Sequence, residues 1–170
     1  MSLTEFTVAG ALLESPDGLL LVQNQRRNGA VDWSTPGGVI DATDASVLHG
    51  LAREVEEETG LLVTEWEGPI YEVRATAPGL GWSMRCEVYR ALGFAGTLRI
   101  DDPDGIVVDA CFAASDRWDD LLGTCAVWVR EPLAEWLAQR WGPSQHRRYA
   151  YDVLGAHRED VQVVRTSPTP

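Results

Sequence analysis

The sequence is poor in cysteine and has no long apolar run. Its three cysteines, Cys86, Cys111 and Cys125, are odd in number and widely spaced, so no pair has the spacing of a zinc site or a redox motif. We expect buried free thiols in a reducing compartment, and therefore a cytoplasmic protein. Glu14 and Asp17 interrupt the early apolar stretch, and no run reaches the ~18 apolar residues of a membrane span. Neither a secretion signal nor a membrane partner is expected.

Basic residues are also scarce. The chain has 14 of them against 26 acidic residues, which gives a formal charge of −12. A surface that acidic repels a phosphate backbone, so polymeric nucleic acid is not expected as a partner. A phosphate-containing substrate would need bound cations to offset the same repulsion. The 170 residues, 45% of them hydrophobic, predict one domain over residues 1–170, with a core at about 5–141 and a C-terminal extension at 142–170.

Apolar runs separated by turn residues predict several strands. Runs at residues 5–13 and 18–24 flank Pro16-Asp17-Gly18 and predict a hairpin. A proline and paired glycines predict a break between elements at residues 33–38. A further break is expected at Gly68-Pro69. The remaining strand-like segments are residues 61–77, 82–94, 106–114, 148–154 and 161–165, before a tail at 166–170 that is expected to fray.

Two segments have helical periodicity. Apolar residues recur at helical spacing between residues 46 and 59, with Asp44 or Ser46 as the N-cap and Gly60 in the place of a C-cap glycine. Glu131-Pro132 is expected to open a second helix that runs to about residue 141. Mixed strands with two main helices predict an α/β protein in which helices cover a sheet.

The densest chemical signal is the run Arg53-Glu54-Val55-Glu56-Glu57-Glu58-Thr59-Gly60-Leu61. Glu54, Glu57 and Glu58 stand at i, i+3 and i+4, so their carboxylates share one helix face. Close like charges repel each other, and near a helix C-terminus they also oppose the macrodipole. A bound Mg²⁺ or Mn²⁺ would offset both effects, because these ions prefer oxygen ligands. Arg53 would orient one carboxylate. The alternative interpretation is a solvated acidic face on a surface helix.

The segment from Gly38 to Leu61 resembles the Nudix box, G-x5-E-x7-R-E-U-x-E-E-x-G-U, where U is a bulky aliphatic residue. Its second half agrees at every fixed position, namely Arg53, Glu54, Val55, Glu57, Glu58, Gly60 and Leu61. In the first half, Asp44 stands where the family has glutamate, and eight residues rather than seven separate it from Arg53. Residues 33–38 resemble the tryptophan and Pro-Gly-Gly approach to the box in many members.

The resemblance implies a Nudix-type α/β/α sandwich with a mixed β-sheet. It implies hydrolysis of a nucleoside diphosphate linked to another group, such as a nucleoside triphosphate, an oxidised nucleotide or an ADP-ribose-like compound. Glu54, Glu57 and Glu58 would be the Mg²⁺ or Mn²⁺ ligands and Arg53 the orienting cation. Glu57 or Glu54 would be the general base, or an acid from a distal loop such as Asp102 or Asp104.

Other residues are candidates for substrate binding. Arg26 and Arg27 end a strand near the box and would grip phosphate, unless they are ordinary exposed residues. Trp33 and Trp82 would either stack on a base or pack in the core. Asp102 and Asp104 would either complete the site or form a polar surface turn. The resemblance also implies that Gly37, Gly38 and Gly60 shape the loop.

The resemblance leaves two other functions open. One is a Nudix-like module that binds a nucleotide without cleaving it, and the other is an acidic interaction domain. The expected partner of either the hydrolase or the binding module is a small-molecule nucleotide. The oligomeric state stays open, a homodimer included.

Overall fold

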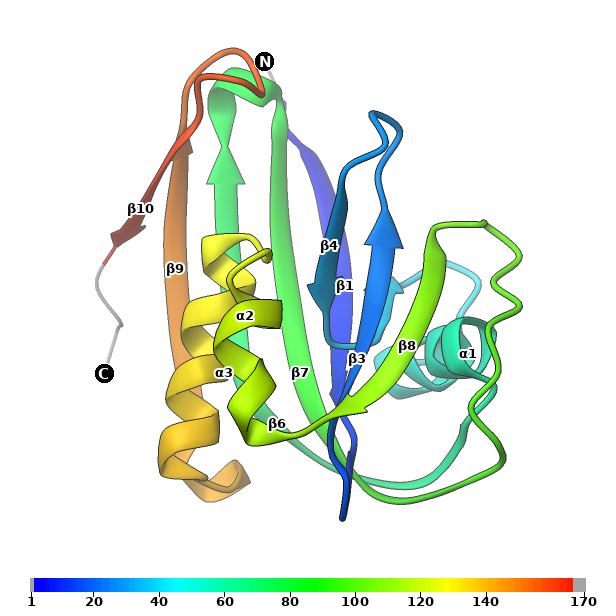
Figure 1. Ribbon diagram of the computed structural model, residues 1–170. Helices are drawn as coiled ribbons and strands as arrows, with labels where there is room; N and C mark the ends of the chain where they lie inside the picture. The colour runs from blue at the N-terminus through cyan, green and yellow to red at the C-terminus, as the bar shows by residue number, and fades with distance from the viewer. Residues whose placement is uncertain (1, 167–170) are drawn as a thin grey trace.

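The computed structural model describes residues 2–166, which form two β-sheets with helices packed around them (Figure 1). The larger sheet has the strand order β10-β9-β6-β7-β1-β5. Its strands are β1 (Thr4–Leu12), β5 (Gly37–Val39), β6 (Leu62–Ala77), β7 (Trp82–Ala95), β9 (Arg147–Leu154) and β10 (Gln162–Thr166). β1 is parallel to β7 and β6 to β9, whereas the other neighbours are antiparallel. The sheet is therefore mixed, as the sequence predicts.

The smaller sheet is built around its central strand. β3 (Gly18–Gln25) pairs antiparallel with β2 (Glu14–Ser15), β4 (Val31–Ser34) and β8 (Val107–Ala113). The predicted hairpin turn is confirmed, but the hairpin is much shorter than residues 5–13 and 18–24, because Glu14 and Ser15 pair with β3 and Leu13 adds one hydrogen bond to Leu20. β1 instead pairs with β7 along its whole length, a contact between distant segments that no local turn signal reveals.

Helices cover both faces of the larger sheet. α1 (Val47–Thr59) contributes Leu51 and Val55 to one core cluster. α3 (Val127–Gln139) contributes Leu133 and Trp136 to the other. Successive residues of β1 enter alternate clusters, Ala11 the first and Leu12 the second, and neighbouring side chains of a strand point to opposite faces. The two clusters thus lie on opposite faces, which confirms the α/β/α sandwich.

Helix α1 begins and ends where the sequence predicts. Of the two candidate N-caps, Ser46 takes the position, and its side chain accepts a hydrogen bond from the His49 backbone N–H at 3.1 Å. Gly60 ends the helix in the left-handed region at φ 74°, and its N–H donates to the Glu56 carbonyl. Asp44 lies outside the helix and is free for another contact.

The break predicted at residues 33–38 is confirmed but is shorter than predicted, because only Thr35 and Pro36 lie between β4 and β5. Trp33 and Ser34 belong to β4, while Gly37 and Gly38 belong to β5. Gly37 has φ 144°, and a Cβ there would lie 2.1 Å from the carbonyl oxygen of Ala9 on β1. The glycine therefore permits close pairing of β5 with β1 instead of ending a strand.

The second helix begins earlier than predicted. α3 starts at Val127, not at Glu131, and places Pro132 in its interior. Val127, Trp128 and Val129 pack against the larger core cluster, so burial extends the helix past the sequence signal for its start. A short helix, α2 (Trp118–Leu122), precedes it and was not predicted.

The predicted break at Gly68-Pro69 is also wrong, since β6 runs through it. The pairing of β6 with β7 nevertheless becomes irregular between Glu67 and Tyr71. β9 and β10 extend the larger sheet beyond β6. Thr166, expected to fray, is the last residue of β10, and the rest of that tail, 167–170, lies outside the described residues. None of the helices within 2–166 combines the length and apolarity needed to cross a membrane.

Candidate active site

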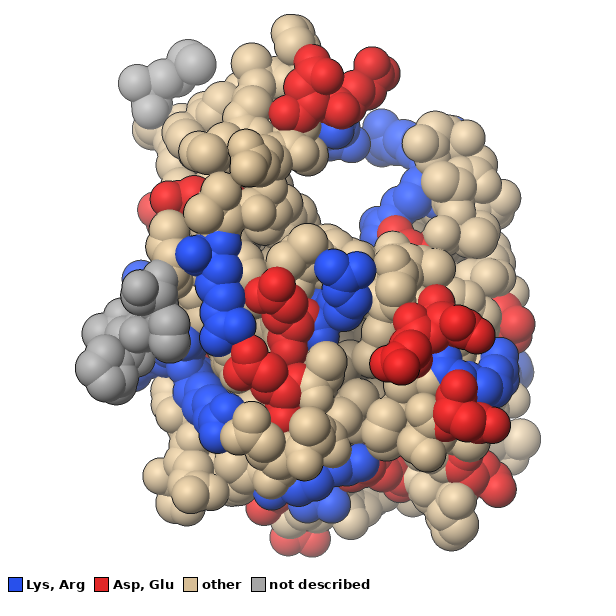
Figure 2. All heavy atoms as spheres, turned by 60° about the vertical axis from the view of Figure 1, so that its left-hand side comes forward, with Lys and Arg blue, Asp and Glu red and all other residues tan. Residues whose placement is uncertain are grey.

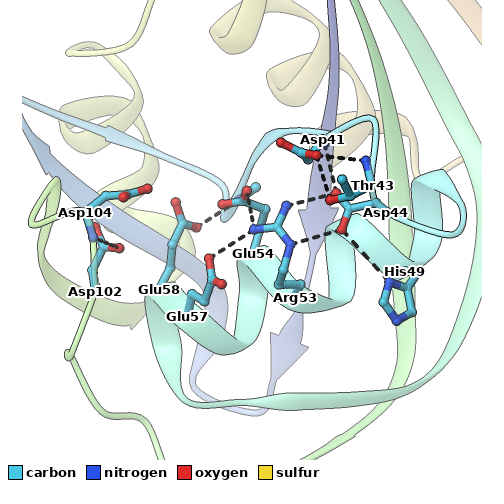
Figure 3. Close-up of polar contacts among 11 residues, drawn as sticks. Asp41, Thr43, Asp44, His49, Arg53, Glu54, Glu57, Glu58, Asp102 and Asp104 are labelled. Atoms are coloured by element: carbon cyan, nitrogen blue, oxygen red, sulfur yellow. Dashed lines mark hydrogen bonds and ion pairs between the residues drawn. The ribbon is translucent and has the colours of Figure 1, made fainter.

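An acidic cleft of about 740 Å³ opens beside α1. It lies between that helix, the glycines of β5, the end of β3 and the loop before β8. Its acidic lining residues are Asp41, Glu54, Glu58, Asp102 and Asp104, and its basic ones are Arg26 and Arg53. Figure 3 shows the acidic side chains of α1 and of the loop on the same side of the helix. Segments distant in sequence thus bring five carboxylates to one cavity.

Arg53 links the loop before α1 to the carboxylates of the helix (Figure 3). Its Nε and Nη2 donate to Asp44 Oδ1 and Oδ2 at 3.1 and 2.9 Å. Its Nη1 donates to Glu54 Oε1 at 2.9 Å and to Glu57 Oε2 at 3.1 Å. The hydrogen bonds from Arg53 hold the pKa of Asp44 below its ordinary value. Asp44 therefore fixes the guanidinium, and the guanidinium in turn orients two of the predicted ligands.

Glu58 is the most buried of the three box carboxylates, with 9% of the residue exposed. Its Oε2 accepts one hydrogen bond, from the Gly37 N–H at 2.9 Å. Burial raises the pKa of Glu58 to about 8, and the charges of Glu54, Asp102 and Glu57 act in the same direction. The single N–H donor does not compensate for these effects. Within residues 2–166, Glu58 is thus a buried carboxyl that lacks a cationic partner.

Glu54 combines partial burial with a close approach to the glycine loop. Burial raises its pKa, which the hydrogen bond from Arg53 opposes. A Cβ on Gly38 would lie 2.8 Å from the Glu54 carboxyl carbon, so a side chain at this position would displace the carboxylate from its present place. Gly37 therefore contacts the Glu58 carboxylate and Gly38 contacts the Glu54 carboxylate. Through these two contacts the loop packs against α1.

The two aspartates of the distal loop differ in their partners. Asp102 accepts hydrogen bonds from the backbone N–H groups of Asp104, Ile106 and Val107 at 2.9–3.2 Å. Its carboxylate therefore ties the loop to the start of β8. No hydrogen bond to the Asp104 carboxylate is present within residues 2–166, although Asp104 lines the cleft. Asp104, unlike Asp102, leaves its oxygens available to a ligand.

The remaining predicted residues fall into two groups. Arg26 lines the cleft and forms a bidentate pair with Asp32 at 2.6 and 2.9 Å, whereas Arg27 is exposed and does not line the cleft. Trp33 packs against the larger core cluster, and its backbone N–H donates to Thr124 Oγ1 at 2.8 Å. Trp82 packs against the same cluster, edge-to-face with Trp128. Neither tryptophan lines the cleft.

Several polar lining residues carry no signal in the sequence. Asn24 on β3 is 7% exposed, and its Nδ2 donates to Asp32 Oδ1 at 3.0 Å and to Ser34 Oγ at 2.9 Å. One asparagine in an apolar strand does not reveal that it will face a cleft. Asp41 and Thr43 also line the cavity. Their residue types do not identify them as lining residues, and only their position in the loop before α1 places them near the site.

The carboxylates fit a hard cation, although they are not arranged as a ready ligand set. Within residues 2–166, no three His, Cys, Asp or Glu side chains lie close enough together to hold a metal ion. Arg53 occupies the space that Glu54 and Glu57 share, and Glu58 is hydrogen-bonded to Gly37. The donors on offer are all carboxylate oxygens, which suit Mg²⁺ or Mn²⁺ and not zinc.

Comparison with known proteins establishes the family. The family model described as NUDIX domain matches residues 5–119, so the chain belongs to the Nudix family, as the box predicts. A search of curated proteins found no match.

Solved structures share the fold at low identity. A MutT protein from Bacillus halodurans is 18% identical with a TM-score of 0.67, covering 94% of each chain. The E. coli ORF135 protein is 21% identical with a TM-score of 0.64, covering 81% of this chain and 92% of that one. An ADP-ribose pyrophosphatase from Streptococcus suis is 23% identical with a TM-score of 0.51, covering 84% and 98%.

Proposed function

We propose that this Nudix protein is a Mg²⁺-dependent pyrophosphohydrolase, with Mn²⁺ as an alternative ion, that cleaves a nucleoside diphosphate linked to another group. The observation that carries the proposal is the acidic cleft at the C-terminal half of α1. Glu54 and Glu58 line it, Glu57 stands beside them on the same helix face, and Asp104 faces them from the loop before β8. A structural role does not account for Glu58, because a buried carboxyl without a cationic partner is unfavourable.

A divalent cation would complete this arrangement. Glu54, Glu57 and Glu58 would hold it, with Asp104 as a further oxygen donor from the opposite wall. A bound cation would offset the diphosphate charge and acidify a water molecule near the phosphorus. Arg53 is already committed to Asp44, Glu54 and Glu57, so it positions the ligands and does not contact the substrate.

Glu54 is favoured over Glu57 as the acceptor of the water's proton. It lines the cleft, and burial raises its pKa, which brings a carboxylate closer to the pH at which a general base works well. Glu57 does not line the cavity, whereas the hydrogen bond from Arg53 is common to both glutamates and does not distinguish them. Of the two distal-loop candidates, Asp102 is committed to three backbone donors, and Asp104 is proposed above as a donor to the cation.

Two features support a nucleotide as the substrate. Arg26 is the basic residue on the wall opposite α1. Its Nε and Nη2 donate to Asp32, and its Nη1 would contact a phosphate. A second cavity, of about 90 Å³, has apolar and aromatic walls that include Tyr71, Met84 and Trp128. Thr35 lines this cavity and the neighbouring Ser34 lines the cleft, so one segment connects the two. Apolar and aromatic side chains suit contact with a nucleobase, which would have to widen this small cavity to enter it.

The test is cleavage of a panel of nucleoside triphosphates, oxidised nucleotides and ADP-ribose-like compounds, followed by chromatography of the nucleotide products. We expect turnover of at least one compound with Mg²⁺, none in excess chelator, and recovery when Mg²⁺ or Mn²⁺ is added back. Binding is measured alongside by calorimetry. Tight binding with no turnover of any compound would favour the nucleotide-binding module, and undiminished turnover in chelator would exclude the cation mechanism.

A further inference from the structure

Gly50 is a buried glycine within helix α1. Glycine is less favourable than alanine inside a helix, because it loses more conformational freedom on folding. Its backbone is helical and has no positive φ that would demand glycine. The reason for glycine at this position therefore lies in what surrounds it.

The carboxylate of Asp44 lies against the missing side chain. A Cβ built on Gly50 would lie 2.6 Å from Asp44 Oδ2 and 2.9 Å from Ile40 Cδ1. The Asp44 carboxylate cannot turn aside without loss, since it accepts two hydrogen bonds from Arg53 and one from the Asp41 N–H. An alanine at position 50 would therefore push Asp44 away from Arg53.

This arrangement matches the departure of the chain from the Nudix box. Asp44 is one methylene shorter than the box glutamate, and one residue is inserted between it and Arg53. A shorter acid must come closer to the helix to reach the same guanidinium. Gly50 stands three residues before Arg53, on the same helix face. The Asp44 carboxylate lies against the helix at this position.

We propose that Gly50 is a positioning residue. Its lack of a side chain lets Asp44 dock against α1, and Asp44 then holds Arg53 between Glu54 and Glu57. The docking geometry stands by itself, whereas its consequence for catalysis rests on the proposed function.

A thermodynamic cycle in chelator tests the docking without any activity. The variants are Gly50→Ala, Asp44→Ala and the double variant, and the readout is the melting temperature. We expect Gly50→Ala to lower it when Asp44 is present. In the Asp44→Ala background the same substitution should raise it by about 1–4 °C, since alanine then improves the helix without meeting the Asp44 carboxylate, and the end of the flexible Ile40 side chain can move aside. A rise of similar size in both backgrounds would overturn the proposal.

Two control variants separate the competing causes. Ala52→Gly changes helix propensity two residues away, and its effect should be the same with and without Asp44. Ile40→Val removes the other atom that a Cβ at position 50 would meet. If Ile40→Val alone restored the stability of Gly50→Ala, the glycine would serve Ile40 and the proposal would be wrong. Should Gly50→Ala fail to fold, the double variant is expected to fold, and its failure would also contradict the proposal.

Mn²⁺ binding and turnover test the consequence for the site. Gly50→Ala and Asp44→Ala should each weaken Mn²⁺ affinity or kcat by about 10–100-fold, the usual cost of losing a residue that orients metal ligands. The double variant should lose no more than either single variant, because both act through Arg53. Additive losses would show that Gly50 does not act through Asp44. Absence of turnover in the parent would defeat the proposed function, while the melting cycle would still decide the docking.

Discussion

Glu58 and Glu72 are equally hidden glutamates with opposite surroundings. Glu58 on α1 is 9% exposed and Glu72 on β6 is 5% exposed. Glu72 accepts hydrogen bonds from Arg85 at 2.9 Å and from Arg74 at 3.2 Å, and these hold its pKa below the ordinary value. Glu58 has one backbone N–H donor and three acidic neighbours, and its pKa rises to about 8.

Partners, and not burial alone, decide what each carboxylate does. The arginines beside Glu72 supply the positive charge that a buried carboxylate needs, so that residue serves the fold. Figure 2 likewise shows basic and acidic side chains side by side on one face of the molecule. Glu58 has no such partner, so its charge is available to a cation from solution. The contrast leads to predictions that treat Glu72 as the matched control for Glu58.

The largest expected effect is on turnover. Glu58→Gln and Glu57→Gln keep the size of the side chain and remove a proposed ligand charge, so each should lower kcat by about 100-fold or more. Glu72→Gln, which also removes a buried carboxylate charge, should keep kcat within a few-fold. Steady-state rates at saturating Mg²⁺ decide the matter. Equal losses in the variants at 58 and 72 would mean that burial, not the cation site, explains them.

The effect on stability should be the reverse of the effect on turnover: Glu72→Gln should destabilise the protein, and Glu58→Gln should not. Glu72→Gln leaves Arg74 and Arg85 without their charged partner, and we expect a loss of about 1–2 kcal/mol, reduced because both arginines are largely exposed. Glu58→Gln relieves an unfavourable buried charge, so the metal-free protein should melt at a higher temperature. Denaturant unfolding in chelator measures both. A destabilised Glu58→Gln would show that its carboxylate already has adequate partners.

The pH dependence of stability should differ in sign between the two glutamates. Because the pKa of folded Glu58 lies above its ordinary 4.5, its contribution is full below that value and is lost as the pH rises toward about 8. The pKa of folded Glu72 lies below 4.5, so its contribution is full above that value and is lost as the pH falls below it. Unfolding in chelator should show the advantage of Glu58→Gln over wild type shrinking from pH 8 to pH 5. The deficit of Glu72→Gln should stay constant there, and a parallel response of both variants would contradict the assignment.

The smallest effect concerns the distal loop, where the same contrast recurs. Asp104 has a free carboxylate in the cleft, so Asp104→Asn should lower kcat or Mg²⁺ affinity by about 10-fold with little change in stability. Asp102 accepts three backbone hydrogen bonds, so Asp102→Ala should cost about 0.5–1.5 kcal/mol of stability. Melting curves and metal titrations of both variants separate these outcomes. If Asp102→Ala weakened metal binding and Asp104→Asn lowered stability, the roles assigned to the two aspartates would be reversed.

The sequence predicts those parts of the fold whose signals are local. Helix α1 has its N-cap at Ser46, its apolar spacing and its Gly60 C-cap within one short segment, and all three are confirmed. The hairpin is shorter than predicted because β1 pairs with β7, which is far away in the chain. The start of α3 was misplaced because burial of residues 127–129 against the core outweighs the Glu131-Pro132 signal.

In the candidate site, too, the sequence predicts the features that depend on local spacing and misses the contacts between distant segments. Helical spacing placed Glu54, Glu57 and Glu58 on one face, and Figure 3 shows them there. The hydrogen bond between Gly37 and Glu58 and the contact of Gly50 with Asp44 depend on how the loop folds over the helix. The network around Asn24 depends on the pairing of β3 with β4. Spacing in the sequence cannot reveal contacts of this kind, because they arise only after distant segments meet.

The most direct test of the central claim is a Mn²⁺ titration, followed by the electron paramagnetic resonance signal of the free ion. Wild type, Glu58→Gln and Glu72→Gln are compared at the same pH and ionic strength. We expect wild type and Glu72→Gln to bind Mn²⁺ with the same affinity, and Glu58→Gln to bind at least about 10-fold more weakly. Unchanged Mn²⁺ binding by Glu58→Gln would contradict the claim that this buried, unpaired carboxylate belongs to a cation site.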